Sequence, residues 1–417
     1  MAENRSLSPM EAVDEYFDML IKSRFIEMFG SFEKNAIFND FVVDMIKGPF
    51  GSDIKKSLFV PKSNDTYKVY IQGNAIRNDE NLGDYYISKE YYDQKMYRFQ
   101  VHPKDYIVTC DGTMGKYIRL SDDIEPGIIS ASLLKLTVDE SAILPRFFEI
   151  QWEKEILPSL LSKVRNGCLC HLPSAKVIGK ERVKLPSLEE QKIFVEFVEQ
   201  VDKSKAICKQ IFQSFDNLVK SRFIEMFGTL DLSTQKSEWK EIGALGTILT
   251  GSTPKTNISE YWDGDIRWIT PAELRLDSFI IDDTDRKITE EGRKSCSLNI
   301  LKPGTVLLTS RAPIGKVAIA GTEMYCNQGF KNIDCGSELN NIYLYTLLKH
   351  NTEYLNSLGR GATFKEISAK IVSGIRIPAP PRKQQDQFED FVRQVDKSKF
   401  EVVQSLLKLK DSMKSSE

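Results

Sequence analysis

The 417-residue sequence lacks a long apolar run, and this absence argues against a membrane protein. No stretch approaches the roughly 20 consecutive apolar residues that a membrane-spanning helix needs. The first residues, MAENRSLSPM, contain no apolar core of a secretory signal. Seven cysteines are scattered without the spacing of a disulfide framework, which is typical of free thiols in a reducing compartment. The sequence therefore predicts a cytoplasmic protein that makes no membrane contact.

A strong charge of one sign is absent as well. The chain carries 57 Lys and Arg against 59 Asp and Glu, which gives a formal net charge of −2. This balance argues weakly against a uniformly basic nucleic-acid binder, but it allows one basic face and one acidic face. The length exceeds what one hydrophobic core usually fills, and it fits two domains with connectors.

Recognisable catalytic motifs are also missing. GTMGKY and APIGKV contain Gly-Lys without the spacing or the following Ser/Thr of a phosphate-binding P-loop. There is no G-x-G-x-x-G motif and no Asn/Asp-Pro-Pro-Tyr/Phe motif of an amino-methyltransferase. Acid-x-Lys triplets such as Asp53-Ile54-Lys55 are expected by chance in a chain with 28% charged residues. A nuclease is therefore a minor alternative, and the sequence predicts a chain without catalysis of its own.

One cysteine-rich segment, Cys168-Leu169-Cys170-His171, invites comparison with a zinc site. A structural zinc site needs about four ligands in tetrahedral geometry. The sequence has three histidines and no second Cys pair at a suitable spacing. We therefore interpret the segment as a loop equivalent to Ala362–Lys365 and predict no metal.

What the sequence does contain is a repeat. Lys22–Gly30 reads KSRFIEMFG, and Lys220–Gly228 reads the same nine letters. Chance identity of this length is negligible in a chain of this size, so at least part of the chain is duplicated. The stretch has helical spacing and ends in glycine, which predicts a helix end closed by a left-handed residue.

The similarity extends over nearly the whole chain. Thr109–Lys116 (TCDGTMGK) aligns with Thr309–Lys316 (TSRAPIGK), and Gln200–Lys205 (QVDKSK) recurs at Gln394–Lys399. Between the shared segments lie short β-rich runs separated by turn residues. These regions match only in their framework, which is typical of one scaffold presenting two different surfaces. The runs expected in the first half are strands at Tyr67–Gln72, Tyr106–Cys110, Tyr117–Leu120 and Gly127–Leu136, and helix at Ala142–Val164.

Long amphipathic helices are predicted between and after these regions. Over Leu188–Phe227, apolar residues alternate at spacings of three and four with no Gly or Pro, which is typical of a coiled coil. About 40 residues at 1.5 Å each give a rod of roughly 60 Å. A similar pattern covers Gln384–Met413, and a shorter one covers Pro9–Phe29. Two rods of equal length would pack antiparallel with their aromatic residues in the core.

The predicted fold class is therefore α+β, with two pseudo-symmetric β-rich domains separated by two long antiparallel coiled-coil helices. The predicted segments are an N-terminal helix (1–35), a first β-rich domain (36–187), a central long helix (188–230), a second β-rich domain (231–381) and a C-terminal long helix (382–417).

Several motifs of the second half carry a resemblance to a known family. They are Gly251-Ser252-Thr253-Pro254, Tyr261–Thr270, Gly304–Ile319, Cys326–Lys331, Gly361–Ser368 and Ile377–Gln385. With them, the chain resembles the specificity subunit of a type I restriction-modification system. The first half departs from the pattern, with Gly48-Pro49-Phe50-Gly51-Ser52 and weaker segments at Thr109–Lys116 and Asn166–Lys176, but it is similar enough to be placed in the same domain family.

The resemblance implies two target recognition domains, each of which reads one half of a split, asymmetric DNA sequence. It also implies that the long helices set the spacing and dock two methyltransferase subunits. The chain itself would hold no cofactor; S-adenosylmethionine, ATP and Mg would belong to partner subunits. Its partners would be double-stranded DNA, the methyltransferase subunits and, in the full complex, restriction subunits.

Polar and basic residues in the repeated loops are the predicted DNA contacts. Guanidinium and ammonium groups bind phosphate or the guanine edge, and amides can read adenine. In the first domain the candidates are Gln72, Asn74, Arg77, Lys116, Arg119, Arg165, His171 and Lys176. In the second domain they are Thr270, Arg275, Arg311, Lys316, Lys331, Arg360, Lys365 and Lys370. The near-neutral charge keeps one main alternative open, namely a protein-interaction scaffold on a coiled coil that binds no DNA.

Overall fold

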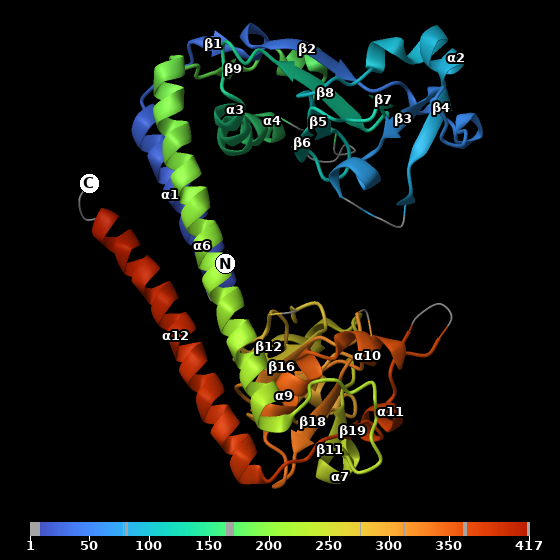
Figure 1. Cartoon of the computed structure of the whole chain (residues 1–417), viewed down its shortest axis with the longest axis vertical. Coiled ribbons are helices and arrows are strands. Elements are labelled where there is room, and N and C mark those ends of the chain that lie inside the picture. The colour runs from blue at the N-terminus through green and yellow to red at the C-terminus, as the bar shows by residue number, and fades with distance from the viewer. Residues whose placement is uncertain are drawn as a thin grey trace. The chain divides into compact units, whose positions relative to one another are not determined.

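A computed structural model describes residues 9–77, 79, 82–163, 171–275, 277–311, 313–361 and 365–414, with side chains as far as residue 405. The chain divides into two compact units (Figure 1). The N-terminal unit is Asp18–Lys203, and the C-terminal unit combines Met1–Phe17 with Ser204–Glu417. Within the described ranges, no helix is long and apolar enough to span a bilayer.

In its described residues, the N-terminal unit contains three small sheets and four short α-helices. Its strands are β1 (Ala36–Ile37), β2 (Val42–Lys47), β3 (Thr66–Tyr70), β4 (Tyr85–Ser88), β5 (Tyr106–Thr109), β6 (Tyr117–Arg119), β7 (Gly127–Ile129), β8 (Leu133–Val138) and β9 (Arg182–Val183). Its short helices are α2 (Lys89–Tyr91), α3 (Pro145–Gln151), α4 (Leu157–Ser162) and α5 (Ala175–Ile178). The sheet orders are β2-β8-β5-β6, β4-β3-β7 and β1-β9, and β3 pairs in parallel with β7.

Strand β5 is buried on both faces, and its alternating side chains join two layers. The Tyr106 ring lies 4.9 Å from the ring of Phe148 on α3, which covers one face of the sheet (Figure 1). Ile107 points to the other face and packs with Val69 and Ile128 of the β4-β3-β7 sheet. The core of the unit therefore has a helix layer, the β2-β8-β5-β6 sheet and a second sheet.

The C-terminal unit repeats this arrangement. Its strands are β10 (Lys240–Glu241), β11 (Gly246–Thr250), β12 (Trp262–Ile269), β13 (Ile280–Ile281), β14 (Lys287–Ile288), β15 (Val306–Leu308), β16 (Val317–Ala320), β17 (Tyr325–Cys326), β18 (Lys331–Cys335) and β19 (Arg376–Ile377). Its helices include α7 (Ile242–Leu245), α8 (Glu290–Lys294), α9 (Asn341–Lys349), α10 (Thr352–Ser357), α11 (Ala369–Ser373) and α12 (Arg382–Lys414). The sheet orders are β11-β18-β15-β16-β13, β14-β12-β17 and β10-β19.

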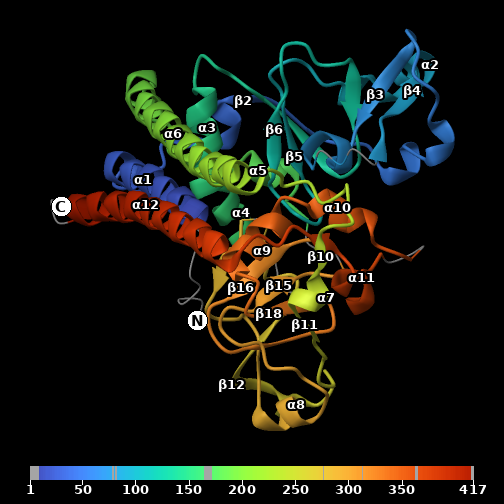
Figure 2. The same ribbon diagram turned by 60° about the horizontal axis from the view of Figure 1, so that its bottom comes forward.

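The strand orders of the two units correspond one to one, apart from the additional edge strand β13. Val306 and Leu308 of β15 face the cluster around α9, whereas Leu307 packs with Ile269 and Phe330 on the opposite side. Strand β12 and helix α8 form one end of this unit, opposite α9 and α12 (Figure 2). The predicted duplication is confirmed by this shared topology, and so is the α+β class.

The long helices α6 and α12 follow the two β-rich domains in sequence, as predicted. Helix α6 covers Leu188–Phe227, the same range that its apolar spacing predicted, and α1 covers Pro9–Phe29. Within the C-terminal unit, the end of α6 runs antiparallel to α12. The Phe223 and Phe388 rings are 5.2 Å apart, and further along both helices the Lys399 ammonium pairs with Asp216 at 2.5 Å. The predicted antiparallel packing is confirmed for this portion of the helices.

The two copies of KSRFIEMFG pack alike. In the N-terminal unit, the rings of Phe25 and Phe29 each lie 5.6 Å from Phe194. In the C-terminal unit, the equivalent Phe223 and Phe227 pack on Phe388, at 5.2 and 5.6 Å. The shared sequence therefore builds the same aromatic joint twice.

The prediction of a left-handed closing glycine holds for one copy only. Gly228 has φ +84°, but Gly30 does not have a positive φ and its N–H bonds to Ile26 O at 2.6 Å. In the second copy, the N–H of Gly228 bonds to Ile224 O at 2.8 Å. The chain leaves the two helices by different routes, so the backbone conformation of the closing glycine differs although the sequence is the same.

Three further predictions need correction. Gly127–Leu136 is two strands separated by a turn, and Ala142–Val164 is broken into α3, a π-helical turn at Trp152–Ile156 and α4. Three apolar residues assigned to the helical seam of α6 are exposed: Ile207 by 56%, Ile211 by 38% and Leu218 by 48%. Their spacings of four and seven put them on one stripe, which lies roughly a quarter turn around the helix from the buried Cys208 and Phe212 and is not part of the packed seam.

Candidate nucleic-acid interface

Each unit contains a tight turn held by a threonine. Between β15 and β16, the Thr309 hydroxyl donates to Pro313 O at 2.8 Å and accepts from the N–H of Lys316 at 3.0 Å. Between β5 and β6, Thr109 makes the same two bonds, to Thr113 O and from the N–H of Lys116. The turn needs glycine near its end, where Gly315 has φ +94°. The residues after these threonines are thus presented on a fixed backbone.

Two further segments bond to each turn through the backbone. In the C-terminal unit, the N–H of Ser310 donates to Gly329 O at 2.8 Å, and its carbonyl accepts from the N–H of Ile367 at 3.0 Å. In the N-terminal unit, Cys110 makes the equivalent bonds, to Ser132 O and from the N–H of Leu172, both at 2.9 Å. Loops far apart in sequence therefore meet at one place in each unit.

A third loop joins the cluster in each unit through a side chain. Lys316 directs its ammonium to the carbonyl of Leu274, which ties the 270–275 loop to the turn. In the N-terminal unit, Gln72 Nε2 donates to Asp111 O at 3.0 Å and to Ser132 O at 3.3 Å. The structure thus brings many of the predicted DNA-contacting residues into two equivalent loop clusters.

Several predicted contact residues are engaged inside the protein. Lys331 is 8% exposed, and its ammonium bonds to the Glu366 carboxylate at 3.0 Å and to Ser310 Oγ at 3.2 Å. The Asn74 side chain accepts from the N–H of Ile71 at 3.0 Å and donates to Asp84 at 3.2 Å. These groups stabilise the shape of the loops, and their polar atoms are committed to protein partners.

Thr270 is held in the same way by Glu273. The N–H and the hydroxyl of Thr270 donate to Glu273 Oε1 at 2.7 and 3.0 Å, and the N–H of Asp285 donates to Oε2 at 2.7 Å. Burial raises the pKa of the Glu273 carboxyl, and these hydrogen bonds partly offset the effect. Glu273 therefore fixes the 270–275 loop.

Three other candidates form ion pairs or hydrogen bonds at the surface. Arg119 pairs with Glu140, Arg275 with Glu11, and the His171 ring with Asp111. Exposed pairs of this kind contribute little stability and can exchange for phosphate. Arg165 lies outside the described residues, as do Cys168 and Cys170. Side chains with exposed positions on or beside the clusters are Arg77, Lys116, Lys176, Arg360, Lys365 and Lys370, with Arg311 half-buried.

The loops at Gly48 and Gly251 approach the backbone of each cluster closely, which the sequence did not predict. A Cβ on Gly48 would lie 1.9 Å from Ser130 O, and one on Gly251 would lie 2.0 Å from Cys326 O. Both glycines thus allow a close backbone approach, and the residues after them stand at the cluster rim. Thr253 there donates its hydroxyl to Gln328 Oε1. The glycines of the GSTP motif (Gly251–Pro254) and the GPFGS motif (Gly48–Ser52) were the features of the sequence that could have indicated these close approaches.

An exposed arginine near β12 was also missed. The Arg286 guanidinium stacks 4.0 Å from the ring centre of Trp262 and 5.3 Å from that of Trp268. Trp268 is buried and its indole N–H donates to Ser252 O at 3.1 Å, which connects this stack to the GSTP loop. Nothing in the sequence indicated this stack, because Arg286 lies 18 residues after Trp268 and only the fold brings them together.

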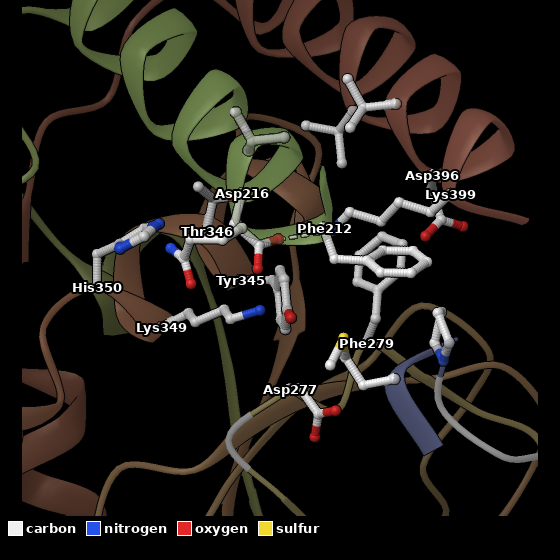
Figure 3. Close-up of a pocket in the computed structure, with 16 residues that line it drawn as sticks. Phe212, Asp216, Asp277, Phe279, Tyr345, Thr346, Lys349, His350, Asp396 and Lys399 are labelled. Carbon is white, nitrogen blue, oxygen red and sulfur yellow. Dashed lines mark hydrogen bonds and ion pairs between the residues drawn. The ribbon is translucent and has the colours of Figure 1, made fainter. Parts of the chain in front are cut away.

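A cavity of about 260 Å³ lies elsewhere in the C-terminal unit, among α6, α9 and α12 (Figure 3). Phe212, Phe279 and Tyr345 surround it, and the Asp216–Lys399 ion pair crosses its rim. None of the predicted DNA-contacting residues lines it. Over the part of the chain that the structure describes, no group of three or more His, Cys, Asp and Glu side chains could hold a metal.

The fold and the clusters define a duplicated α+β domain with a constant loop frame and a variable rim. Residues 235–409 match the family of the Type I restriction modification DNA specificity domain. The C-terminal part of the chain therefore carries that domain.

Known proteins with similar sequences are named as specificity subunits. The type I restriction enzyme MjaIX specificity subunit of Methanocaldococcus jannaschii is 44% identical over 174 residues, which cover 40% of each chain. The type I restriction enzyme HindI specificity subunit of Haemophilus influenzae is 26% identical over 148 residues, 35% of this chain and 32% of that one. These alignments span less than half of either relative.

Solved structures are similar over more of the chain at lower identity. The HsdS subunit from Thermoanaerobacter tengcongensis is 16% identical, with a TM-score of 0.36 over 85% of this chain and 89% of that chain. A chain from a type I R-M complex is also 16% identical, with a TM-score of 0.48 over 90% of this chain and 95% of that chain.

Proposed function

We propose that the chain is the DNA specificity subunit of a type I restriction-modification complex and has no catalytic activity of its own. Residues 36–187 and 231–381 would each read one half of a bipartite, asymmetric target. The observation that carries this proposal is the duplicated loop cluster, in which the same hydrogen-bonded frame presents different rim residues. The family match of residues 235–409 supports it, and the shared strand order extends the assignment to the N-terminal unit.

The contacts with DNA divide into two groups. Arg77, Lys116, Lys176, Arg360 and Lys365 are exposed, and we assign them to phosphate or base contacts. The engaged residues Lys316, Lys331, Asn74 and Thr270 are assigned to holding the loops in shape. A side chain bonded within the protein still affects specificity, because it positions its exposed neighbours.

The helical segments 1–35, 188–230 and 382–417 would act as a spacer and dock two methyltransferase subunits. The exposed stripe of Ile207, Ile211 and Leu218 supports this, because apolar side chains on one face of a helix are typical of a protein interface. S-adenosylmethionine would come with those subunits, and ATP and Mg²⁺ with restriction subunits, in the cytoplasm. The stripe also favours the alternative of a protein scaffold that binds no DNA.

Binding measured against salt separates the two functions. Methylome sequencing of cells that express the chain with its methyltransferase subunits would first reveal the target and its spacer. The purified complex should then bind a duplex with that target, and log Kd should rise steeply and linearly with log salt because phosphate contacts release counterions. A complex that forms but binds no duplex would favour the scaffold, and an identical pair of inverted half-sites would contradict asymmetric reading.

A further inference from the structure

Phe50 is the most exposed of the large apolar side chains in the described residues, at 80%. It follows Gly48 and the buried Pro49 in the loop after β2. An exposed phenylalanine ring keeps a large apolar area in water, which would be stabilised by contact with another molecule. The position is therefore a candidate for a partner contact.

The backbone that carries Phe50 is held from both sides. The N–H of Gly48 donates to Leu133 O at 2.9 Å, and the close approach to Ser130 leaves no room for a side chain at Gly48. On the other side, the Phe50 carbonyl accepts from the N–H of Asp53 at 2.8 Å. A ring on a fixed backbone loses little conformational freedom when it binds.

The segment that carries Phe50 is rich in basic side chains, and one of them connects it to the proposed interface. Lys47, Lys55 and Lys56 are exposed in the same short segment. The Lys47 ammonium lies 3.8 Å from the carboxylate of Asp111, which also contacts His171 of the loop cluster. An exposed apolar ring in a lysine-rich segment fits a partner with a polyanionic backbone and apolar bases, which is the chemistry of a nucleic-acid duplex.

The C-terminal unit places a polar group at the corresponding position. Gly251 makes the same close approach as Gly48, and Thr253 follows it at the spacing of Phe50. Thr253 bonds to Gln328, which is exposed. The two units thus offer different chemistry at one equivalent place on the rim.

We propose that Phe50 is a specificity-determining residue whose ring packs against the apolar surface of a base in the half-site read by residues 36–187. The inference rests on the proposed DNA-binding function. Two base surfaces have the required chemistry, namely the 5-methyl group of thymine and the face of a base at an opened step. In either case the ring distinguishes sequences, since neither surface is the same for all base steps.

The test uses the full chain in complex with its methyltransferase subunits and a duplex carrying the methylome-derived target. Phe50→Ala should weaken binding to this duplex roughly ten- to hundredfold, and Phe50→Leu should weaken it less. The matched control is Tyr97→Ala, which removes a ring that is 67% exposed and lies outside both the loop cluster and the helical segments, so it should bind the duplex like the wild type. The melting temperature of Phe50→Ala should equal that of the wild type because the ring makes few internal contacts.

Two modified duplexes identify the base surface. Replacing thymine by deoxyuracil in the half-site should weaken the wild type but not Phe50→Ala if the ring contacts the methyl group. A 2-aminopurine reporter should brighten with the wild type and not with Phe50→Ala if the ring opens a base step. Equal binding by the wild type and Phe50→Ala to the target duplex would overturn the inference while leaving the proposed function intact. Failure of the wild type to bind any target duplex would instead remove the proposed function, and the inference with it.

Discussion

A buried glutamine joins each β-rich domain to its long helix, and its removal gives a quantitative prediction. Gln385 of α12 is 0% exposed. Its Oε1 accepts from the N–H of Asn340 at 2.8 Å, and its Nε2 donates to Glu338 O at 2.9 Å and Pro380 O at 2.7 Å. The side chain thus satisfies three backbone groups at the point where domain and helix meet.

Gln385→Ala leaves one N–H and two carbonyls without their partner. Each unsatisfied buried group costs about 1–3 kcal/mol, and partial entry of water reduces the sum, so we expect a loss of about 3–5 kcal/mol in the free energy of unfolding of the C-terminal unit. Urea unfolding followed by tryptophan fluorescence measures this loss, because Trp239 and Trp268 are buried in that unit.

The neighbouring Gln384 is a matched control. It is exposed on the same helix turn, so Gln384→Ala should change stability by less than about 0.5 kcal/mol. Gln191 occupies the equivalent joint of the N-terminal unit and bonds to Leu144 N, Ala142 O and Pro186 O at 2.8, 3.1 and 2.9 Å. Gln191→Ala should therefore destabilise that unit by a similar amount. A Gln385→Ala variant as stable as Gln384→Ala would refute the reasoning.

Two further predictions follow from buried titratable groups. Burial lowers the pKa of Lys349 below its usual 10.5, so at this group the folded state binds fewer protons than the unfolded state just below that pH, and its contribution to stability should rise with pH there, against the opposite contribution of buried groups such as Cys326 and Tyr345, whose pKa values are raised. Lys349→Met should lose this rise in urea midpoints measured from about pH 8 to 10.5, and an unchanged slope would contradict the assignment. Burial also raises the pKa of the Cys110 and Cys326 thiols to about 12, so mass spectrometry after iodoacetamide treatment of the folded chain at about pH 8 should find both unmodified. Cys296, which is only half-buried, should react faster, and equal labelling of all three would show that the units open readily.

Local patterns predicted the helices better than the sheets. The bounds of α6 follow from apolar spacing and the absence of Gly and Pro, which a continuous segment displays by itself. Strand β2 was not predicted, because its pairing with β8 is set by residues about 90 positions away, as in Lys47 with Leu134. The turn at Ser130 was missed because Ser130-Ala131-Ser132 contains neither glycine nor proline and apolar residues lie on both sides of it.

The candidate site was predicted at the level of loops and not of roles. The recurring Thr109 and Thr309 segments indicated the two turns that the structure places in equivalent loop clusters, since both units share this motif. The role of Lys331 could not be predicted, because its partner Glu366 lies in a loop that only the fold brings near. Phe50 was visible in the sequence, but phenylalanine is usually buried, and its exposure is a property of the folded loop.

The threonine turn has a consequence for how such a chain can change during evolution. Thr309 and Gly315 complete the hydrogen bonding of the turn without help from the side chains of Arg311 or its neighbours at the tip. Mutations at the tip are therefore free of most of the selection that acts on folding. New binding preferences can arise there by single substitutions, while the frame that holds them is inherited unchanged.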